Sequence, residues 1–261
     1  LEEKQMKDVN LKRLKDCMKR AEAGEELTIG FLGGSITQGS LATTMENTSD
    51  YRVFTWWKQT FPKANVHYVN GGIGGTTSHY GVSRAVTDVL MYQPDFVVVD
   101  FSVNDETDIF FQETYEGVVR KLLSWDSKPA VVLLNNVFYD TGLNAQEYHN
   151  EVGNWYQVPH VSVRDTIYQR MKAGEYIREE LTPDGLHPND KGHKLVAEEI
   201  EKFLESVKAE LEVEEKEPVF PKAMTENAYE NAKRLTIREI SPKLCGFHAD
   251  TEEKTGHLDH F

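Results

Sequence analysis

Short apolar runs alternate with amphipathic stretches over most of this 261-residue sequence, and this alternation constrains the fold more than any other feature. Continuous apolar runs are typical of strands buried on both faces in a parallel sheet. Strands that alternate with helices imply right-handed crossovers, with helices on both faces of the sheet. We expect strands at residues 27–32, 66–69, 96–101, 130–135 and 158–161, and helices at residues 11–24, 50–61, 80–90, 114–124, 145–155 and 190–211.

The pattern predicts an α/β protein, a three-layer α/β/α sandwich with a central parallel sheet, over residues 1–211. A hydrophobic content of 39% supports a core of that size. Residues 212–222 are acidic and contain two prolines, so we expect a linker there. Residues 223–261 form a short C-terminal extension, in which residues 234–240 alternate like a half-buried strand. The extension either packs on the main domain or opens a second, all-β module.

The charge balance limits the class of partner. Lys and Arg number 29 against 43 Asp and Glu, a formal net charge of −14 that repels nucleic acid and anionic lipid. No apolar stretch is long enough to span a membrane, and the first twenty residues do not resemble a secretion signal. We therefore expect a cytoplasmic protein, although the chain begins at Leu1. Two cysteines suggest neither a disulfide framework nor a four-cysteine metal site, and nothing indicates the oligomeric state.

Polar or glycine-rich segments follow three of the predicted strands, and a fourth such segment precedes the last helix. In open parallel sheets, ligands bind at the carboxyl ends of the strands, where such segments gather. We therefore expect the binding and catalytic residues at that edge of the sheet. The segments are residues 33–37 (GGSIT), 70–77 (NGGIGGTT), 102–105 (SVND) and 184–188 (DGLHP).

These segments together contain the parts of a serine-based hydrolytic site. A serine becomes nucleophilic beside a base, and the base needs an acceptor on its other nitrogen. Asp184 lies three residues before His187, a spacing that places a carboxylate beside Nδ1 and leaves Nε2 for Ser35. An oxyanion needs two or three fixed donors. We expect these from the Ser35 N–H, the Gly72 N–H and the Asn104 side chain.

Candidate substrate contacts are less specific. Tyr80 and Tyr139 are expected at loops or strand ends, where an aromatic ring can stack on a sugar. Asp105 follows Asn104 and could contact substrate, although the pair could equally form a turn that ends a strand.

Several features that suggest cofactors fail closer comparison. Residues 34–40 have the glycine spacing of a phosphate-binding loop but lack its lysine, and residues 72–77 lack the third glycine of a dinucleotide site. Histidines and aspartates near the C-terminus are spaced irregularly, which favours solvated side chains over a metal site. We expect no metal and no organic cofactor. The C-terminal residues concerned are His248, Asp250, His257, Asp259 and His260.

The four segments resemble those of the SGNH (GDSL-like) hydrolases. Ser35 matches the first block of that family, Gly72 the second, Asn104 the third, and Asp184 with His187 the fifth, in the family's order. The resemblance covers residues 25–211. It departs from the family pattern where the first block has GGSIT in place of GDSL and where Ser102 replaces a common glycine.

The GGSIT start, the NGGIGGTTS loop and the acidic linker are also similar to those of acetylmannan esterases from gut bacteria, which pair an SGNH domain with a carbohydrate-binding β-sandwich. The resemblance implies a serine esterase that removes acetyl groups from an acetylated oligosaccharide through an acyl-enzyme. The same machinery also serves lipid esters, lysophospholipids and thioesters in relatives. A non-catalytic glycan-binding protein on a hydrolase scaffold is the alternative from another class.

Overall fold

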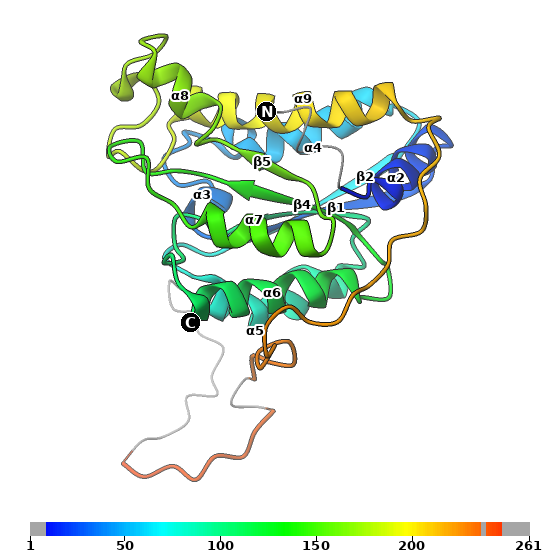
Figure 1. Ribbon diagram of the computed structural model, residues 1–261, viewed down its shortest axis with the longest axis vertical. Helices are drawn as coiled ribbons and strands as arrows, with labels where there is room; N and C mark the ends of the chain where they lie inside the picture. The colour runs from blue at the N-terminus through cyan, green and yellow to red at the C-terminus, as the bar shows by residue number, and fades with distance from the viewer. Residues whose placement is uncertain (1–8, 236–238, 247–261) are drawn as a thin grey trace.

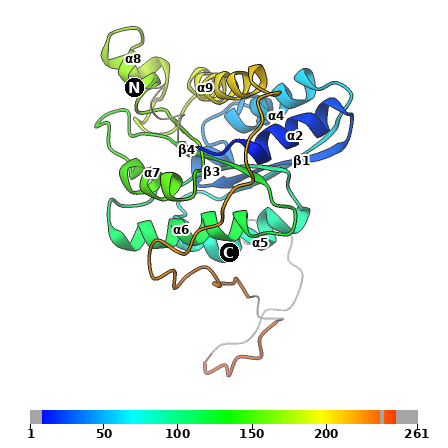
Figure 2. The same ribbon diagram turned by 45° about the vertical axis from the view of Figure 1, so that its right-hand side comes forward.

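The computed structural model describes residues 9–235 and 239–246. Its centre is a five-stranded sheet with the order β2-β1-β3-β4-β5, in which every neighbouring pair is parallel. Helices cover both faces of this sheet, as Figures 1 and 2 show, which confirms the predicted three-layer α/β/α fold. The strands are β1 (Glu26–Gly33), β2 (Asn65–Gly72), β3 (Phe96–Asp100), β4 (Ala130–Asn135) and β5 (His160–Ser162).

The helices divide into two layers. In Figure 1, α4 and α9 lie above the sheet, and α5, α6 and α7 lie below it. Helix α2 packs with α9 and β4 on the first face. The helices are α2 (Lys12–Glu22), α3 (Ser35–Gln38), α4 (Ser49–Thr60), α5 (Ser78–Asp88), α6 (Ile109–Leu123), α7 (Gln146–Trp155), α8 (Ile167–Lys172) and α9 (Asp190–Ala209), with 3₁₀ turns η2 (Met45–Asn47), η3 (Leu90–Tyr92) and η4 (Arg178–Glu180).

Alternation along the central strands explains how one sheet supports two cores. Phe96 and Val98 of β3 join the apolar cluster under α2, α4 and α9. Val97 and Val99 point the other way and join the cluster under α5, α6 and α7. Successive side chains of a strand face opposite sides, so a continuous apolar run is needed where both sides are buried. All four of these residues are at most 2% exposed.

The predicted strands correspond to the observed ones to within two residues at most ends, and the predicted helix starts do so for every helix except α6. Helix α6 begins at Ile109, five residues before the predicted start, because the Asp108 side chain caps it by accepting a hydrogen bond from Phe111 N–H at 2.9 Å. The short helices α3 and α8 were not predicted, since so few residues show no helical period.

The chain after α9 runs along the surface of the sandwich. Lys15 pairs with Glu215 at 3.0 Å, and the Trp155 indole donates to the carbonyl of Lys222 at 2.9 Å. Further along, the backbone N–H groups of Met224 and Thr225 donate to the Glu116 carboxylate of α6. The expected linker at residues 212–222 therefore lies against the main domain.

The structure tests only part of the expectations for the C-terminal extension. Residues 234, 235, 239 and 240 are not in a strand, and residues 236–238 of the expected strand lie outside the described residues. The C-terminal histidines and aspartates from residue 248 onward also lie outside them. Within the described part of the chain, no helix is long and apolar enough to cross a membrane.

Candidate active site

A hydroxyl, an imidazole and a carboxylate lie in line at the carboxyl edge of the sheet. Ser35 starts α3 directly after β1, and its Oγ lies 2.8 Å from Nε2 of His187. Nδ1 of the same ring lies 2.7 Å from Oδ2 of Asp184. An ionised carboxylate only accepts hydrogen bonds, so Nδ1 carries the proton and Nε2 accepts from the Ser35 hydroxyl. The structure thus brings together three residues that the sequence places up to 152 positions apart.

Asp184 is held by its own turn. Its Oδ1 accepts hydrogen bonds from the backbone N–H of His187 at 2.8 Å and of Leu186 at 3.0 Å, and from the Thr182 hydroxyl at 3.1 Å. Partial burial alone would raise the pKa of Asp184, but the hydrogen bonds from His187, Leu186 and Thr182 outweigh it and hold the pKa well below its usual range. The carboxylate is therefore ionised wherever the protein is folded near neutral pH.

The start of α9 fastens the His187 turn to the loop that follows Ser35. Asp190 accepts hydrogen bonds from the backbone N–H of Thr43 at 2.8 Å and from its hydroxyl at 2.6 Å. His193 is fully buried, and its Nε2 lies 3.1 Å from the carbonyl of Ser40. The sequence alone predicts neither contact, because each joins segments about 150 residues apart.

Asn104 lies against the nucleophile turn with its carboxamide unpaired. A Cβ on Gly34 would lie 2.3 Å from the Asn104 Oδ1, so glycine at this position lets the two segments meet. Among the described residues, no hydrogen bond engages the Asn104 side chain. An unpaired amide beside the serine is what an oxyanion donor requires.

The glycine loop differs from the sequence expectation. The Gly72 N–H donates to Oδ1 of Asn70 at 2.7 Å, and the Gly74 N–H donates to Oε1 of Gln38 at 2.9 Å. The N–H of Gly75 has no partner among the described residues, and its φ of 69° lies in the left-handed region that favours glycine. A Cβ on Gly74 would lie 3.7 Å from that of Ser35, so the loop passes beside the serine. The expectation for Gly72 is corrected, because its amide is already bonded inside the protein.

Two of the three candidate substrate contacts are buried. Tyr139 is 2% exposed and belongs to the core under α9, so its ring cannot stack on a sugar and that expectation is corrected. The Asp105 carboxylate is fully buried and bonded to protein groups, so it is not open to substrate. Tyr80 is half-buried in α5, with the Arg84 guanidinium 5.7 Å from its ring centre, and its contact with substrate stays a prediction.

Two further carboxyl groups lie beneath the site. Asp100 ends β3, where burial raises its pKa to about 7 despite hydrogen bonds from Asn136 and Thr37. Burial and the nearby charge of Asp100 also raise the pKa of Asp50 well above its usual value. Both groups are at most 3% exposed. Asp100 accepts from Thr37 of α3, the helix that Ser35 starts, and no hydrogen bond joins either carboxyl group to Ser35 or His187 among the described residues.

The arrangement defines a class of site: a serine hydroxyl bonded to a histidine that an aspartate orients, with free amide donors beside it, as in serine hydrolases. Within residues 9–235 and 239–246, no three His, Cys, Asp or Glu side chains gather as a metal-binding group. Residues 31–195 match the GDSL-like Lipase/Acylhydrolase family, so the chain belongs to that family.

Comparison with solved structures agrees with this membership. A two-domain esterase (CEX) active on acetylated mannans superposes with a TM-score of 0.93 at 49% identity, covering 96% of this chain and 67% of that one. The same esterase co-crystallised with mannopentaose gives a TM-score of 0.86. An acetyl xylan esterase, AlAXEase, has a TM-score of 0.56 at 22% identity over 68% of this chain and 99% of that one, which supports the fold alone.

One curated protein also matches part of the chain. It is a tyrosine–tRNA ligase from Streptomyces coelicolor, 25% identical over 105 residues that make up 40% of this chain. The match spans only 22% of the ligase's length, so it carries no argument about activity.

The aspartate gives a direct test of the site. Asp184→Asn places an amide donor against Nδ1–H of His187, which favours the tautomer whose Nε2 cannot accept a proton. We expect kcat on p-nitrophenyl acetate to fall by about 10³–10⁴-fold. Because the pKa of Asp184 lies below its usual 3.8, the carboxylate stays ionised above that pH and its protonation limits neither rate nor stability there.

Asp140→Asn is the matched control for this variant. Asp140 lies beside the same turn but pairs with Arg178 at 3.0 Å. We expect Asp140→Asn to keep kcat within about twofold of the wild-type value, as most surface substitutions do. A wild-type kcat in folded Asp184→Asn would exclude the aspartate from the reaction.

Proposed function

We propose that this protein is a serine esterase that removes acetyl groups from an acetylated, mannan-derived oligosaccharide through an acyl-enzyme on Ser35. The single observation that carries the proposal is the line from Ser35 Oγ through His187 to Asp184, with contacts of 2.8 Å and 2.7 Å. Family membership and the similarity to an esterase active on acetylated mannans support it.

The proposed reaction proceeds in two halves. Ser35 Oγ attacks the acetyl carbonyl while His187 Nε2 takes its proton. The tetrahedral intermediate collapses, the bond to the sugar oxygen breaks, and His187 returns the proton to the departing sugar hydroxyl. Water then attacks the acetyl-serine with His187 as base, which releases acetate and restores the serine. Asp184 holds the ring and stabilises its charged form throughout.

The oxyanion is proposed to bind three donors. The Ser35 N–H and the Asn104 carboxamide are two of those expected from the sequence. We assign the third to the Gly75 N–H, because the Gly72 and Gly74 amides are bonded to Asn70 and Gln38. The path of the loop beside Ser35 supports this assignment.

The choice of carbohydrate rests on the esterase of 49% identity, which was crystallised with mannopentaose. This chain covers 67% of that two-domain protein. We therefore propose that residues 223–261 lead into a second, carbohydrate-binding module beyond the hydrolase domain of residues 1–211. The cytoplasmic location stays a prediction.

Replacing the serine tests the proposed nucleophile. Ser35→Ala removes the attacking oxygen while the fold is retained, so release of acetate from acetylated mannan oligosaccharides should fall by at least about 10⁴-fold. Acetate is measured directly in the reaction mixture. Ser206→Ala, on α9, is the control, since its hydroxyl donates only to the carbonyl of Phe203. Acetate release by Ser35→Ala at the same rate as by Ser206→Ala would refute the proposed mechanism. If the wild-type enzyme released no acetate, the proposed function would be refuted.

Acyl chain length separates the acetyl esterase from a lipid esterase or thioesterase of the same fold. A site for acetyl groups leaves a longer chain without a pocket, so kcat/KM on p-nitrophenyl acetate should exceed that on p-nitrophenyl octanoate by at least about tenfold. The two esters share a leaving group, so the ratio reports the acyl site alone. A preference for octanoate would favour the lipid function.

A further inference from the structure

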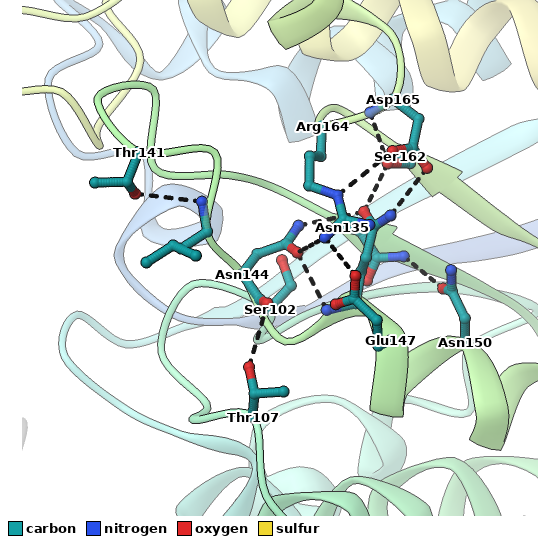
Figure 3. Close-up of polar contacts among 12 residues, drawn as sticks. Ser102, Thr107, Asn135, Thr141, Asn144, Glu147, Asn150, Ser162, Arg164 and Asp165 are labelled. Atoms are coloured by element: carbon teal, nitrogen blue, oxygen red, sulfur yellow. Dashed lines mark hydrogen bonds and ion pairs between the residues drawn. The ribbon is translucent and has the colours of Figure 1, made fainter.

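The loop that carries Asn104 has no regular structure of its own and is fastened to the segment between β4 and α7. It joins β3 to α6 over residues 101–108. Figure 3 shows Ser102 and Thr107, near its two ends, beside Asn144. The Ser102 hydroxyl donates to the carbonyl of Asn136 at 3.0 Å, and the Ala145 N–H donates to the carbonyl of Ser102 at 2.8 Å. The Thr107 hydroxyl donates to the carbonyl of Asn144 at 3.5 Å.

Asp105 makes the central contact of this loop. One oxygen accepts the backbone N–H of Ser78 at 2.8 Å, and the other lies 3.0 Å from Nε2 of His149 on α7. Ser78 follows directly after the glycine loop and starts α5. A single carboxylate therefore joins both loops that carry the proposed oxyanion donors, on either side of the nucleophile.

His149 makes this contact from a buried position in the core. Its ring stacks on Tyr115 with centroids 3.5 Å apart and planes 2° from parallel. Neither the His149 nor the Asp105 side chain is exposed to solvent. Nδ1 of His149 has no hydrogen-bond partner among the described residues, so its one polar contact is with Asp105. A buried carboxylate without hydrogen-bond donors would be strongly destabilising, so His149 and the Ser78 N–H together permit Asp105 at this position.

We propose that Asp105 and His149 are positioning residues that set the Asn104 carboxamide for the oxyanion. The pair does not touch substrate, and it acts through the donors next to it in the chain. This inference rests on the proposed function. A purely structural pair would contribute to the free energy of unfolding alone, whereas a positioning pair also affects kcat, and only while Asn104 is present to be positioned.

His149→Phe tests the pair, because it keeps an aromatic ring on Tyr115 and removes the donor to Asp105. We expect kcat on p-nitrophenyl acetate to fall by about 10- to 100-fold, as for a small misplacement of catalytic groups, with KM changed by less than about twofold. His149→Gln returns a donor and should recover part of the rate. It also serves as the second variant if the phenylalanine variant folds poorly.

A double-mutant cycle separates positioning from structure. In an Asn104→Ala background, His149→Phe should reduce kcat by less than about threefold, because the donor it positions is gone. His160→Phe is the matched control, a histidine on β5 whose ring nitrogens have no partner among the described residues, and it should leave kcat unchanged.

Two results would overturn the proposal: a wild-type kcat in folded His149→Phe, or the same fold-loss with and without Asn104. Both are read from the rate that the folded variants retain relative to an active wild-type enzyme. They are therefore distinct from failure of the proposed function, which is an absence of acetate release by the wild-type enzyme or its persistence in Ser35→Ala.

Discussion

The account depends on one hydrogen bond, the 2.8 Å contact between Ser35 Oγ and His187 Nε2. It joins the first strand-to-helix turn of the domain to the turn before its last helix, 152 positions later. A serine hydroxyl alone is a weak nucleophile, and a histidine without an oriented tautomer is an unreliable base. The proposed chemistry therefore exists only because the parallel sheet brings both turns to one edge.

Two sets of contacts hold this edge in place. On the imidazole side, Asp190 and His193 fasten the start of α9 to residues 40–43. On the oxyanion side, Asp105 bonds to Ser78 and His149 and so fixes the loop before α5 and the loop after β3 together. Donors fixed before the substrate arrives need no reorganisation during the reaction, which is where such sites gain most of their rate. The contacts of Asp105 are buried, whereas those of Asp190 with Thr43 lie at the surface.

The sequence predicted the sheet, the layers and the reacting residues because those depend on patterns carried by the chain itself. Apolar runs such as residues 96–101 report burial on both faces, and the spacing of Asp184 and His187 limits what they can do together. Prediction from the sequence failed where the conformation of a side chain decides which groups are free to contact the substrate. The Gly72 N–H donates to Asn70 in a local hydrogen bond, and the Tyr139 side chain is buried although it follows a strand in a loop. Neither feature produces a periodic pattern in the sequence.

Covalent trapping of the serine tests the central claim most directly. A fluorophosphonate phosphonylates only an activated serine, so peptide mapping by mass spectrometry after inactivation should place one adduct on Ser35. The same treatment of His187→Ala should leave Ser35 unmodified, because the base is gone. An inactivated wild-type enzyme with its adduct on another residue, or equal labelling of Ser35 with and without His187, would contradict the account.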